Sequence, residues 1–375
     1  MADDSTTEKF STKGLYVTGG EFNRDTTYIT DRIVADPANE TARSGGELWP
    51  VEAGRYRLIA ARACPWANRT LITRRLMGLE DAISLGMPGP THDARSWSFD
   101  DETDGVDPVL KIRRLQDAYL RRFPDYPRGI TVPALVDLPS GAVVTNDFNQ
   151  MVIDLATQWG EHQRADAPDL YPEARRAEID ELNNFLFHNV NNGVYKCGFA
   201  GDEAAYGKAF DELFSALDTL EERLQNQRFL MGDQITLVDV QLFVTLVRFD
   251  PVYHGHFKCN RNQLSAFPAL WAYARDLFQT PGFGDTIDFV QIKQHYYVTH
   301  TDLNPTQVVP HGPDLSGWHS GHGREALSDQ PFGDAAAPGP VRAGEEVPRN
   351  HGVAGQGVPA PDEVAAALAA CHPQD

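Results

Sequence analysis

Short apolar runs and longer amphipathic runs alternate along the first half of the chain. The short runs predict buried strands at residues 58–61, 82–85, 130–136 and 141–144. The longer runs repeat apolar residues every three or four positions and predict helices at residues 66–77, 109–123 and 146–159. The resulting order is strand, helix, strand, helix, strand, strand, helix.

The second half of the chain has helical periodicity, with long runs at residues 173–191, 203–226, 237–249 and 270–278. One helix start is sharply defined. Thr236 to Asp239 has the form of a capping box, and Ile235 and Val240 stand at the positions of a hydrophobic staple. We expect the helix that begins there to be central and buried.

These patterns predict a thioredoxin-like α/β domain followed by an all-α domain. The expected parts are an N-terminal arm at 1–50, the thioredoxin-like domain at 51–160, the helical domain at 170–300, a C-terminal wrap at 301–318 and a disordered tail at 319–375. The tail is assigned on composition, because Gly, Pro, Ala and Asp dominate it.

Composition and charge exclude several classes of function. No run approaches the roughly 20 apolar residues of a membrane span, and the polar start lacks a signal-peptide core. A net charge of −20 argues against nucleic acid and anionic membranes as partners. The four cysteines are scattered without framework spacing, which favours the reducing cytoplasm. The acidic, arginine-rich composition fits either a GC-rich genome or adaptation to salt.

Candidate chemistry centres on Cys64, which stands between a predicted strand and a predicted helix. Pro65 suits the first helical position, so the sulfur falls at the helix N-terminus. Unpaired N–H groups and the helix dipole favour a thiolate there, and we expect a pKa below the ordinary value of about 8.5. The alternative interpretation is a small buried hydrophobe. Because Ala67 stands where dithiol sites carry a second cysteine, a disulfide on Cys64 needs an outside thiol to clear it.

Metal and nucleotide sites are not favoured by the sequence. His254, His256 and Cys259 have metal-like spacing, but no fourth ligand lies nearby. The chain also lacks a P-loop and a dinucleotide fingerprint.

Several long motifs over residues 14–317 give the chain a specific resemblance to the glutathionyl-hydroquinone reductases, the Xi class of glutathione transferases. In chain order they are ACPWA from Ala63, WSFDD from Trp97, TVPAL from Thr131, NNGVYKCGFA from Asn191, RFDPVYHGHFKCN from Arg248 and HYY…NPT from His295.

The resemblance implies a reaction on a hydroquinone that carries a thioether-linked glutathione. Cys64 attacks the glutathionyl sulfur, hydroquinone leaves, and a second thiol resolves the mixed disulfide. The implied phenolic proton donors are Tyr195, Tyr253 and Tyr296. Without the resemblance, each tyrosine would be read as an amphipathic side chain at a helix interface. Family members are dimers, so the resemblance also implies a homodimer.

The resemblance also implies a binding site for the thiol cosubstrate, made of Pro65, Trp66, Trp97, Val132, Pro133, Asp147 and Phe148. Asp147-Phe148 departs from the family pattern, which has Glu-Ser there. The acid is one carbon shorter and a bulky ring replaces the hydroxyl, at the place expected to hold the γ-glutamyl group. The cosubstrate is therefore glutathione or a thiol without that group, such as mycothiol.

Other functions remain open from the sequence. The enzyme alternatives are a general thiol transferase or a dehydroascorbate reductase, both of which would use the same cysteine. Conjugation of thiols to electrophiles would need a Ser or Tyr where Cys64 stands. A noncatalytic transferase-like binding module would generally lack a cysteine at the helix start.

Overall fold

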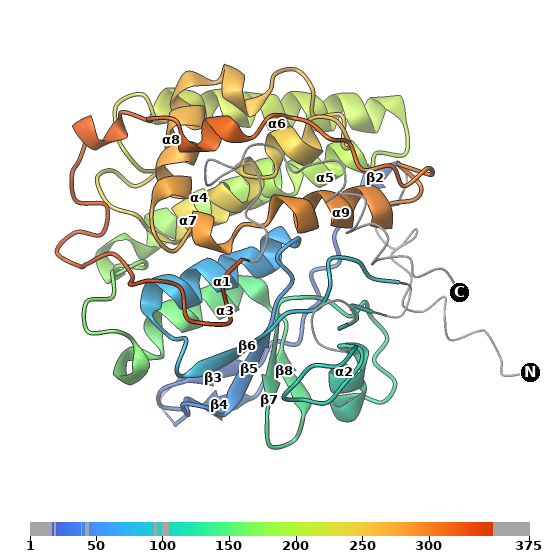
Figure 1. Ribbon diagram of the computed structural model, residues 1–375, viewed down its shortest axis with the longest axis vertical. Helices are drawn as coiled ribbons and strands as arrows, with labels where there is room; N and C mark the ends of the chain where they lie inside the picture. Colours follow the sequence, from blue (N-terminus) through green and yellow to red (C-terminus); the bar gives the residue numbers. More distant parts are fainter. Residues whose placement is uncertain are drawn as a thin grey trace, which may run out of the picture.

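The structure is a computed structural model that describes residues 17–18, 20–38, 40–41, 45–93, 96–99 and 105–347. A small sheet lies at one end of the molecule and a bundle of helices at the other (Figure 1). Helices α1 (Pro65–Met77) and α3 (Phe148–Thr157) lie between the two. Because α1 packs against both α3 and helix α7 (Leu237–Leu246) of the bundle, it is buried along its whole length.

The sheet has the predicted thioredoxin-like arrangement. Its strands are β5 (Tyr56–Ile59), β6 (Ile83–Gly86), β7 (Ala134–Asp137) and β8 (Ala142–Thr145). They pair in the order β6-β5-β7-β8, with β5 parallel to β6 and the other two pairs antiparallel. All four residues of β5 are buried, as expected of a central strand covered on both faces. The fold class predicted from the sequence is confirmed.

Helix α2 is shorter than its periodicity predicted. It spans Gln116–Arg122, whereas the apolar repeat begins at residue 109. The Asp107 carboxylate accepts a hydrogen bond from the Leu110 N–H at 2.7 Å, and the Leu115 N–H donates to the Trp97 carbonyl at 3.0 Å. The first half of the repeat is therefore held as a turn and paired with a neighbouring loop.

The second half of the chain forms a helical bundle around α7. The other helices are α4 (Arg176–Leu186), α5 (Gly193–Gly198), α6 (Glu203–Arg223), α8 (Pro268–Gln279) and α9 (Phe289–Thr299). Every residue of α7 is buried, and its predicted capping box is present, with the Thr236 N–H donating to the Asp239 carboxylate at 2.8 Å. Helix α9 was not predicted, because buried polar residues such as Lys293 and Gln294 obscure its apolar repeat. Within the described ranges, no helix has both the length and the apolar character needed to cross a membrane.

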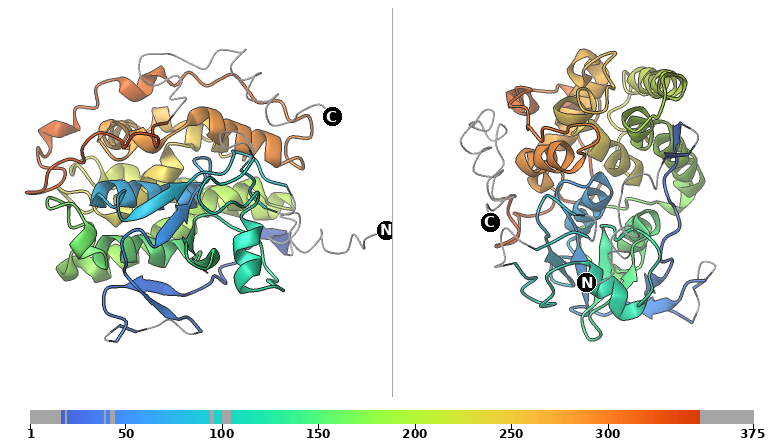
Figure 2. Two further views of the ribbon diagram at one scale, coloured as in Figure 1. Left: turned by 60° about the horizontal axis from the view of Figure 1, so that its bottom comes forward. Right: turned by 90° about the vertical axis from the view of Figure 1, so that its right-hand side faces the viewer.

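The N-terminal arm contacts both halves of the molecule. Its short strands are β1 (Val17–Thr18), β2 (Glu21–Phe22), β3 (Arg32–Val34) and β4 (Leu48–Pro50). β1 pairs with β2 and β3 with β4. Thr30 bridges to Thr145 of the central sheet, while β2 lies beside α5 of the bundle (Figure 2). The segment between these contacts therefore crosses from the bundle to the sheet.

Residues 319–347, which we call the C-terminal strap, return from the bundle to α1. Arg324 donates to the Leu224 carbonyl at 3.0 Å, and Glu345 accepts two hydrogen bonds from Arg74 of α1 at 2.7 and 2.8 Å. The strap is therefore ordered against the body, in contrast to the disorder predicted from residue 319 onward. Composition could not reveal that arginines of the body bind it. The remainder of the predicted tail, 348–375, lies outside the described residues, as do residues 1–16 of the arm.

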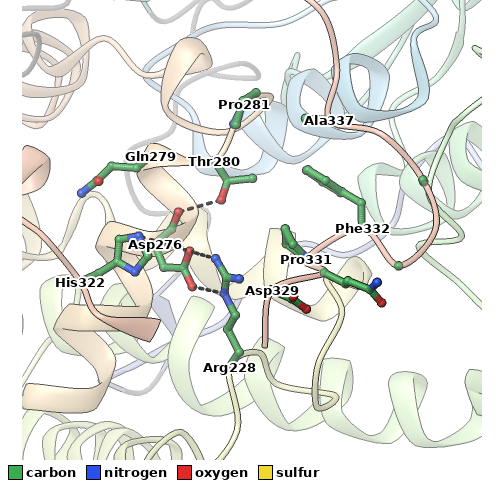
Figure 3. A pocket seen from close by; sticks show the side chains of 13 residues that line it. Arg228, Asp276, Gln279, Thr280, Pro281, His322, Asp329, Pro331, Phe332 and Ala337 are labelled. Atoms are coloured by element: carbon green, nitrogen blue, oxygen red, sulfur yellow. Dashed lines mark hydrogen bonds and ion pairs between the residues drawn. The ribbon is translucent and has the colours of Figure 1, made fainter. Parts of the chain in front are cut away.

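The strap and α8 enclose a cavity of about 390 Å³ (Figure 3). Arg228 and Asp276 form a two-point ion pair in it, with both contacts at 2.8 Å, and His322 lies 3.7 Å from the same carboxylate. Because the charges of this pair satisfy each other, we interpret the cavity as part of the attachment of the strap.

Candidate active site

Cys64 occupies the N-cap position of α1, as the sequence predicted, and Pro65 follows at the start of the helix. The Cys64 residue is 8% exposed. Its thiol donates to the Val132 carbonyl at 3.7 Å. The Val132–Pro133 peptide is cis, a question that the sequence left open. The loop before β7 therefore lies directly against the helix start.

The pKa of the Cys64 thiol is raised, which contradicts the predicted shift. Burial is the largest cause, because desolvation disfavours the charged thiolate. The backbone N–H groups of Ala67 and Trp66 and the charges of Arg248 and Arg24 act in the opposite direction. These N–H groups do not complete a side-chain capping bond to the sulfur. The effect of the helix terminus is therefore present, but burial outweighs it.

Cys64 lines a cavity of about 140 Å³ at the junction of the arm, α1 and the start of β7. Four other predicted site residues line the same cavity: Trp66, Trp97, Val132 and Phe148. Pro65 and Pro133 adjoin this lining without contributing to it. The remaining lining residues include Arg24, Asp25 and Tyr28 from the arm and His92 from the loop after β6.

The three predicted tyrosines form a chain of hydroxyl groups beside this cavity. The Tyr296 hydroxyl lies 2.7 Å from that of Tyr195 and 2.9 Å from that of Tyr253. The Tyr195 ring centroid is 6.1 Å from that of Trp66, which places this end of the chain nearest Cys64. Burial raises the pKa of all three hydroxyls, so each keeps its proton at neutral pH and can donate it.

Asp147 and Phe148 face different spaces. Phe148 lines the Cys64 cavity, whereas Asp147 lines a neighbouring groove of about 910 Å³. The Asp147 carboxylate caps α3 by accepting from the Gln150 N–H at 3.3 Å. Tyr28 lines both spaces and meets Phe148 edge-on at 5.3 Å between ring centroids. An aromatic pair therefore borders both spaces, and Asp147 is not part of the Cys64 cavity.

Arg248 fixes the backbone that delivers Cys64, a role that the sequence analysis missed. It is fully buried and donates to the carbonyls of Arg62 and Ala63 at 2.8 and 3.0 Å. It also donates to the Val244 carbonyl of α7 at 2.7 Å. Arg248 therefore joins the bundle to the loop before α1. The sequence contains one signal for this role, a charged residue shortly after the apolar run of α7.

Four histidines lie around the tyrosine chain: His256 and His295 are buried, and His92 and His300 are half-buried. His256 Nε2 is 3.2 Å from His300 Nδ1, and the His295 ring stacks on Trp97 with centroids 5.0 Å apart. Burial lowers the pKa of His256 to about 4 and that of His295 to about 3, and it also lowers the pKa values of His92 and His300. All four are therefore neutral at pH 7 and place no positive charge beside the tyrosine hydroxyls, and His92 also lines the Cys64 cavity.

This cluster predicts a loss of stability in mild acid. In the unfolded chain His256 binds a proton near pH 6.5, but in the folded chain only near pH 4, so the unfolded state binds more protons between these values. Stability from this group is complete above pH 7 and falls by about 2 kcal/mol by pH 5. Urea unfolding of His256→Gln should show a pH 7 to pH 5 loss smaller than the wild-type loss by about that amount. The exposed His188→Gln should keep the wild-type loss, and an unchanged slope in His256→Gln would contradict the prediction.

His256 and Cys259, two of the residues whose spacing in the sequence resembles that of metal ligands, do not face a common point. His256 contacts His300, while the Cys259 thiol faces the Val194 carbonyl at 3.9 Å. In the part of the chain that the structure describes, no group of three or more His, Cys, Asp or Glu side chains is arranged to hold a metal ion.

Comparison with known proteins matches both halves of the chain. The family "Glutathione S-transferase, N-terminal domain" matches residues 63–158, and "Glutathione S-transferase, C-terminal domain" matches residues 194–276. Glutathionyl-hydroquinone reductase YqjG of Escherichia coli is 39% identical over 312 residues, which cover 82% of this chain and 93% of the relative. The chain belongs to the glutathionyl-hydroquinone reductases, the Xi class of glutathione transferases.

Solved structures of glutathione transferases and their homologues agree in fold. A glutathione transferase from Gordonia bronchialis is 63% identical, with a TM-score of 0.82, over 86% of this chain and 98% of the other. The Xi transferase of Phanerochaete chrysosporium is 38% identical, with a TM-score of 0.76, over 82% and 97% of the two chains. The glutathione-bound structure of YqjG is 37% identical, with a TM-score of 0.73, over 78% and 95%. The chain is therefore an enzyme of the glutathione transferase superfamily, as the motifs predicted.

Proposed function

We propose that this protein is a thiol-dependent reductase that releases free hydroquinone from thioether conjugates, with Cys64 as the nucleophile. The observation that carries the proposal is the Cys64 sulfur on a cavity that lies beside the Tyr195–Tyr296–Tyr253 hydroxyl chain. The name of the E. coli relative, a glutathionyl-hydroquinone reductase, supports the same substrate class here.

In the first step the Cys64 thiolate attacks the thioether sulfur, and the C–S bond to the ring breaks as an S–S bond forms. Carbon is a poor leaving group, so the ring carbon must gain a proton before the bond breaks. The tyrosine hydroxyls suit this role because their raised pKa values keep them protonated. The ring carbon is reduced, and the two sulfurs are oxidised to a mixed disulfide.

In the second step an outside thiol attacks the mixed disulfide and frees Cys64. Ala67 stands one helical turn away and supplies no resolving thiol. The other described cysteines, Cys197 and Cys259, are buried and do not line the cavity. Resolution therefore requires a small thiol in solution. The same mixed disulfide would also support general thiol transfer or reduction of dehydroascorbate, which we retain as alternative activities.

Glutathione and mycothiol are both candidates for the small thiol. The glutathione-bound relative favours glutathione. In this chain, however, the Phe148 ring lines the Cys64 cavity and Asp147 faces the neighbouring groove. Asp147, the acid expected to meet a γ-glutamyl amine, is therefore not placed to do so in the Cys64 cavity, whose carboxylates are Asp25 and Asp93. We further propose Pro65, Trp66, Trp97, Val132 and Pro133 as the thiol-binding wall, and a cytoplasmic homodimer whose mass light scattering would measure.

The proposal is tested by incubating the protein with glutathionyl-hydroquinone and either glutathione or mycothiol, and measuring free hydroquinone by chromatography. We expect release with at least one thiol. Without a second thiol, we expect one equivalent of hydroquinone and a mixed disulfide on Cys64 in the intact mass. Cys197→Ser should behave as the wild type. No hydroquinone with either thiol, or a mixed disulfide on another cysteine, would overturn the proposal.

A further inference from the structure

Arg24 of the N-terminal arm reaches into the Cys64 cavity between two aromatic rings. Its guanidinium carbon lies 4.5 Å from the Trp66 ring centroid and 4.6 Å from that of Tyr195. Its Nε donates to the Asn192 side-chain oxygen at 2.6 Å, which fixes the direction of the guanidinium. A residue from an arm without sequence periodicity is thus held within the site by contacts with both halves of the molecule.

The positive charge of Arg24 has no anionic partner among the residues that the structure describes. Its Nη2 is buried and donates no hydrogen bond. Some buried arginines have a carboxylate partner, as Arg57 has in Asp107 at 2.8 Å, while Arg69 and Arg248 donate to amide or carbonyl oxygens. Arg24 differs from these in lining the Cys64 cavity. An unsatisfied buried donor on a cation is costly, so its retention beside a cavity indicates a ligand with an anionic oxygen.

The proposed reaction produces such an oxygen. When the tyrosine chain protonates the ring carbon and a phenol proton returns to that chain, the ring becomes a ketone that still carries the thioether. Attack by the Cys64 thiolate on the sulfur then sends the C–S electron pair through the ring onto the ketone oxygen. Hydroquinone leaves as a phenolate, which takes its final proton from the tyrosine chain or water.

We propose that Arg24 is a further catalytic residue, whose guanidinium binds the phenolate oxygen that forms on the departing hydroquinone. The inference rests on the proposed function. The position of Arg24 favours binding to the quinol part of the substrate. Arg24 lies against Tyr195, whose hydroxyl belongs to the proton-donating chain. A carboxylate of the thiol cosubstrate is the other anion that Arg24 could bind.

The test is a series of glutathionyl-hydroquinones whose released phenols differ in acidity, assayed with Arg24→Gln. Loss of an oxyanion partner should lower kcat/KM about 10²-fold for the least acidic hydroquinone. The loss should shrink for chlorinated hydroquinones, because their phenolates need less stabilisation. Reduction of hydroxyethyl disulfide, whose leaving group is a thiolate, should fall less than about 3-fold. Arg24→Lys should recover part of the loss, and Asn192→Ala should give a smaller loss of the same pattern.

Arg261→Gln is the control, because Arg261 is a half-exposed arginine whose ion-pair partner, Asp218, does not line the cavity. It should keep wild-type rates with every substrate. An Arg24→Gln loss of kcat/KM that is equal for all hydroquinones and for the disulfide would overturn the proposal. A raised KM for the thiol with unchanged kcat would also overturn it, because Arg24 would then bind a carboxylate of the thiol cosubstrate. If the wild type reduces the disulfide but releases no hydroquinone, the proposed function itself fails.

Discussion

Replacing Cys64 with serine is expected to lower hydroquinone release by about 10³-fold or more. A serine hydroxyl does not ionise at neutral pH and cannot enter a disulfide, so both proposed steps lose their nucleophile. Hydroquinone release under single-turnover conditions measures the first step alone. Cys197→Ser is the matched control, because Cys197 is also buried, at 1% exposed against 8% for Cys64, but does not line the cavity. A Cys64→Ser protein that released hydroquinone at the wild-type rate would remove the proposed mechanism.

The raised pKa of Cys64 gives this prediction a pH dependence. Because burial favours the neutral thiol, the thiolate fraction grows as the pH rises toward and beyond the ordinary cysteine value of about 8.5. Alkylation of Cys64 by iodoacetamide should therefore accelerate through an inflection above that value, and Cys64→Ser should lose this phase. An inflection well below it would show that the N–H groups of α1 prevail over burial after all.

The parts of the fold that the sequence predicted are those in which local pattern and final environment agree. Strand β5 overlaps a short apolar run and is buried on both faces, and α7 is mostly apolar, buried on all sides and at the centre of the bundle. The helix start at Cys64-Pro65 is likewise local, since proline favours the first helical turn wherever that turn lies. Such elements need no knowledge of distant residues.

The features that the sequence could not predict depend on contacts between distant segments. Helix α2 lost its first half to bonds with Asp107 and the loop at Trp97, and the strap is held by arginines of the body. The direction of the Cys64 pKa shift depends on how deeply the folded chain buries one sulfur. Arg24 lies in a segment without sequence periodicity, and the charge of Arg248 after the apolar run of α7 does not show that it binds the loop before α1.

Removing the Arg248 side chain is expected to damage stability and cysteine chemistry together. Arg248→Met leaves the carbonyls of Arg62 and Ala63 without their buried donors, and it deletes a charge that acts to lower the Cys64 pKa. We expect the free energy of unfolding in urea to fall by about 3 to 5 kcal/mol, since several hydrogen bonds to a charged group are lost. The alkylation inflection of Cys64 should also move to higher pH.

Arg248→Lys separates the two effects, because lysine keeps the charge but lacks the planar guanidinium that donates to the loop before α1 and to α7 at the same time. In Arg248→Lys the pH of the alkylation inflection should return toward the wild-type value, while the free energy of unfolding stays low. Arg261→Met is the control for loss of an arginine nearby in the sequence. Arg261 forms an exposed pair with Asp218 at 2.8 Å, and its loss should cost at most about 1 kcal/mol. If Arg248→Met unfolds like Arg261→Met and keeps the wild-type alkylation profile, the loop before α1 holds its position without the bundle. The raised thiol pKa would then be set by burial and the helix terminus alone.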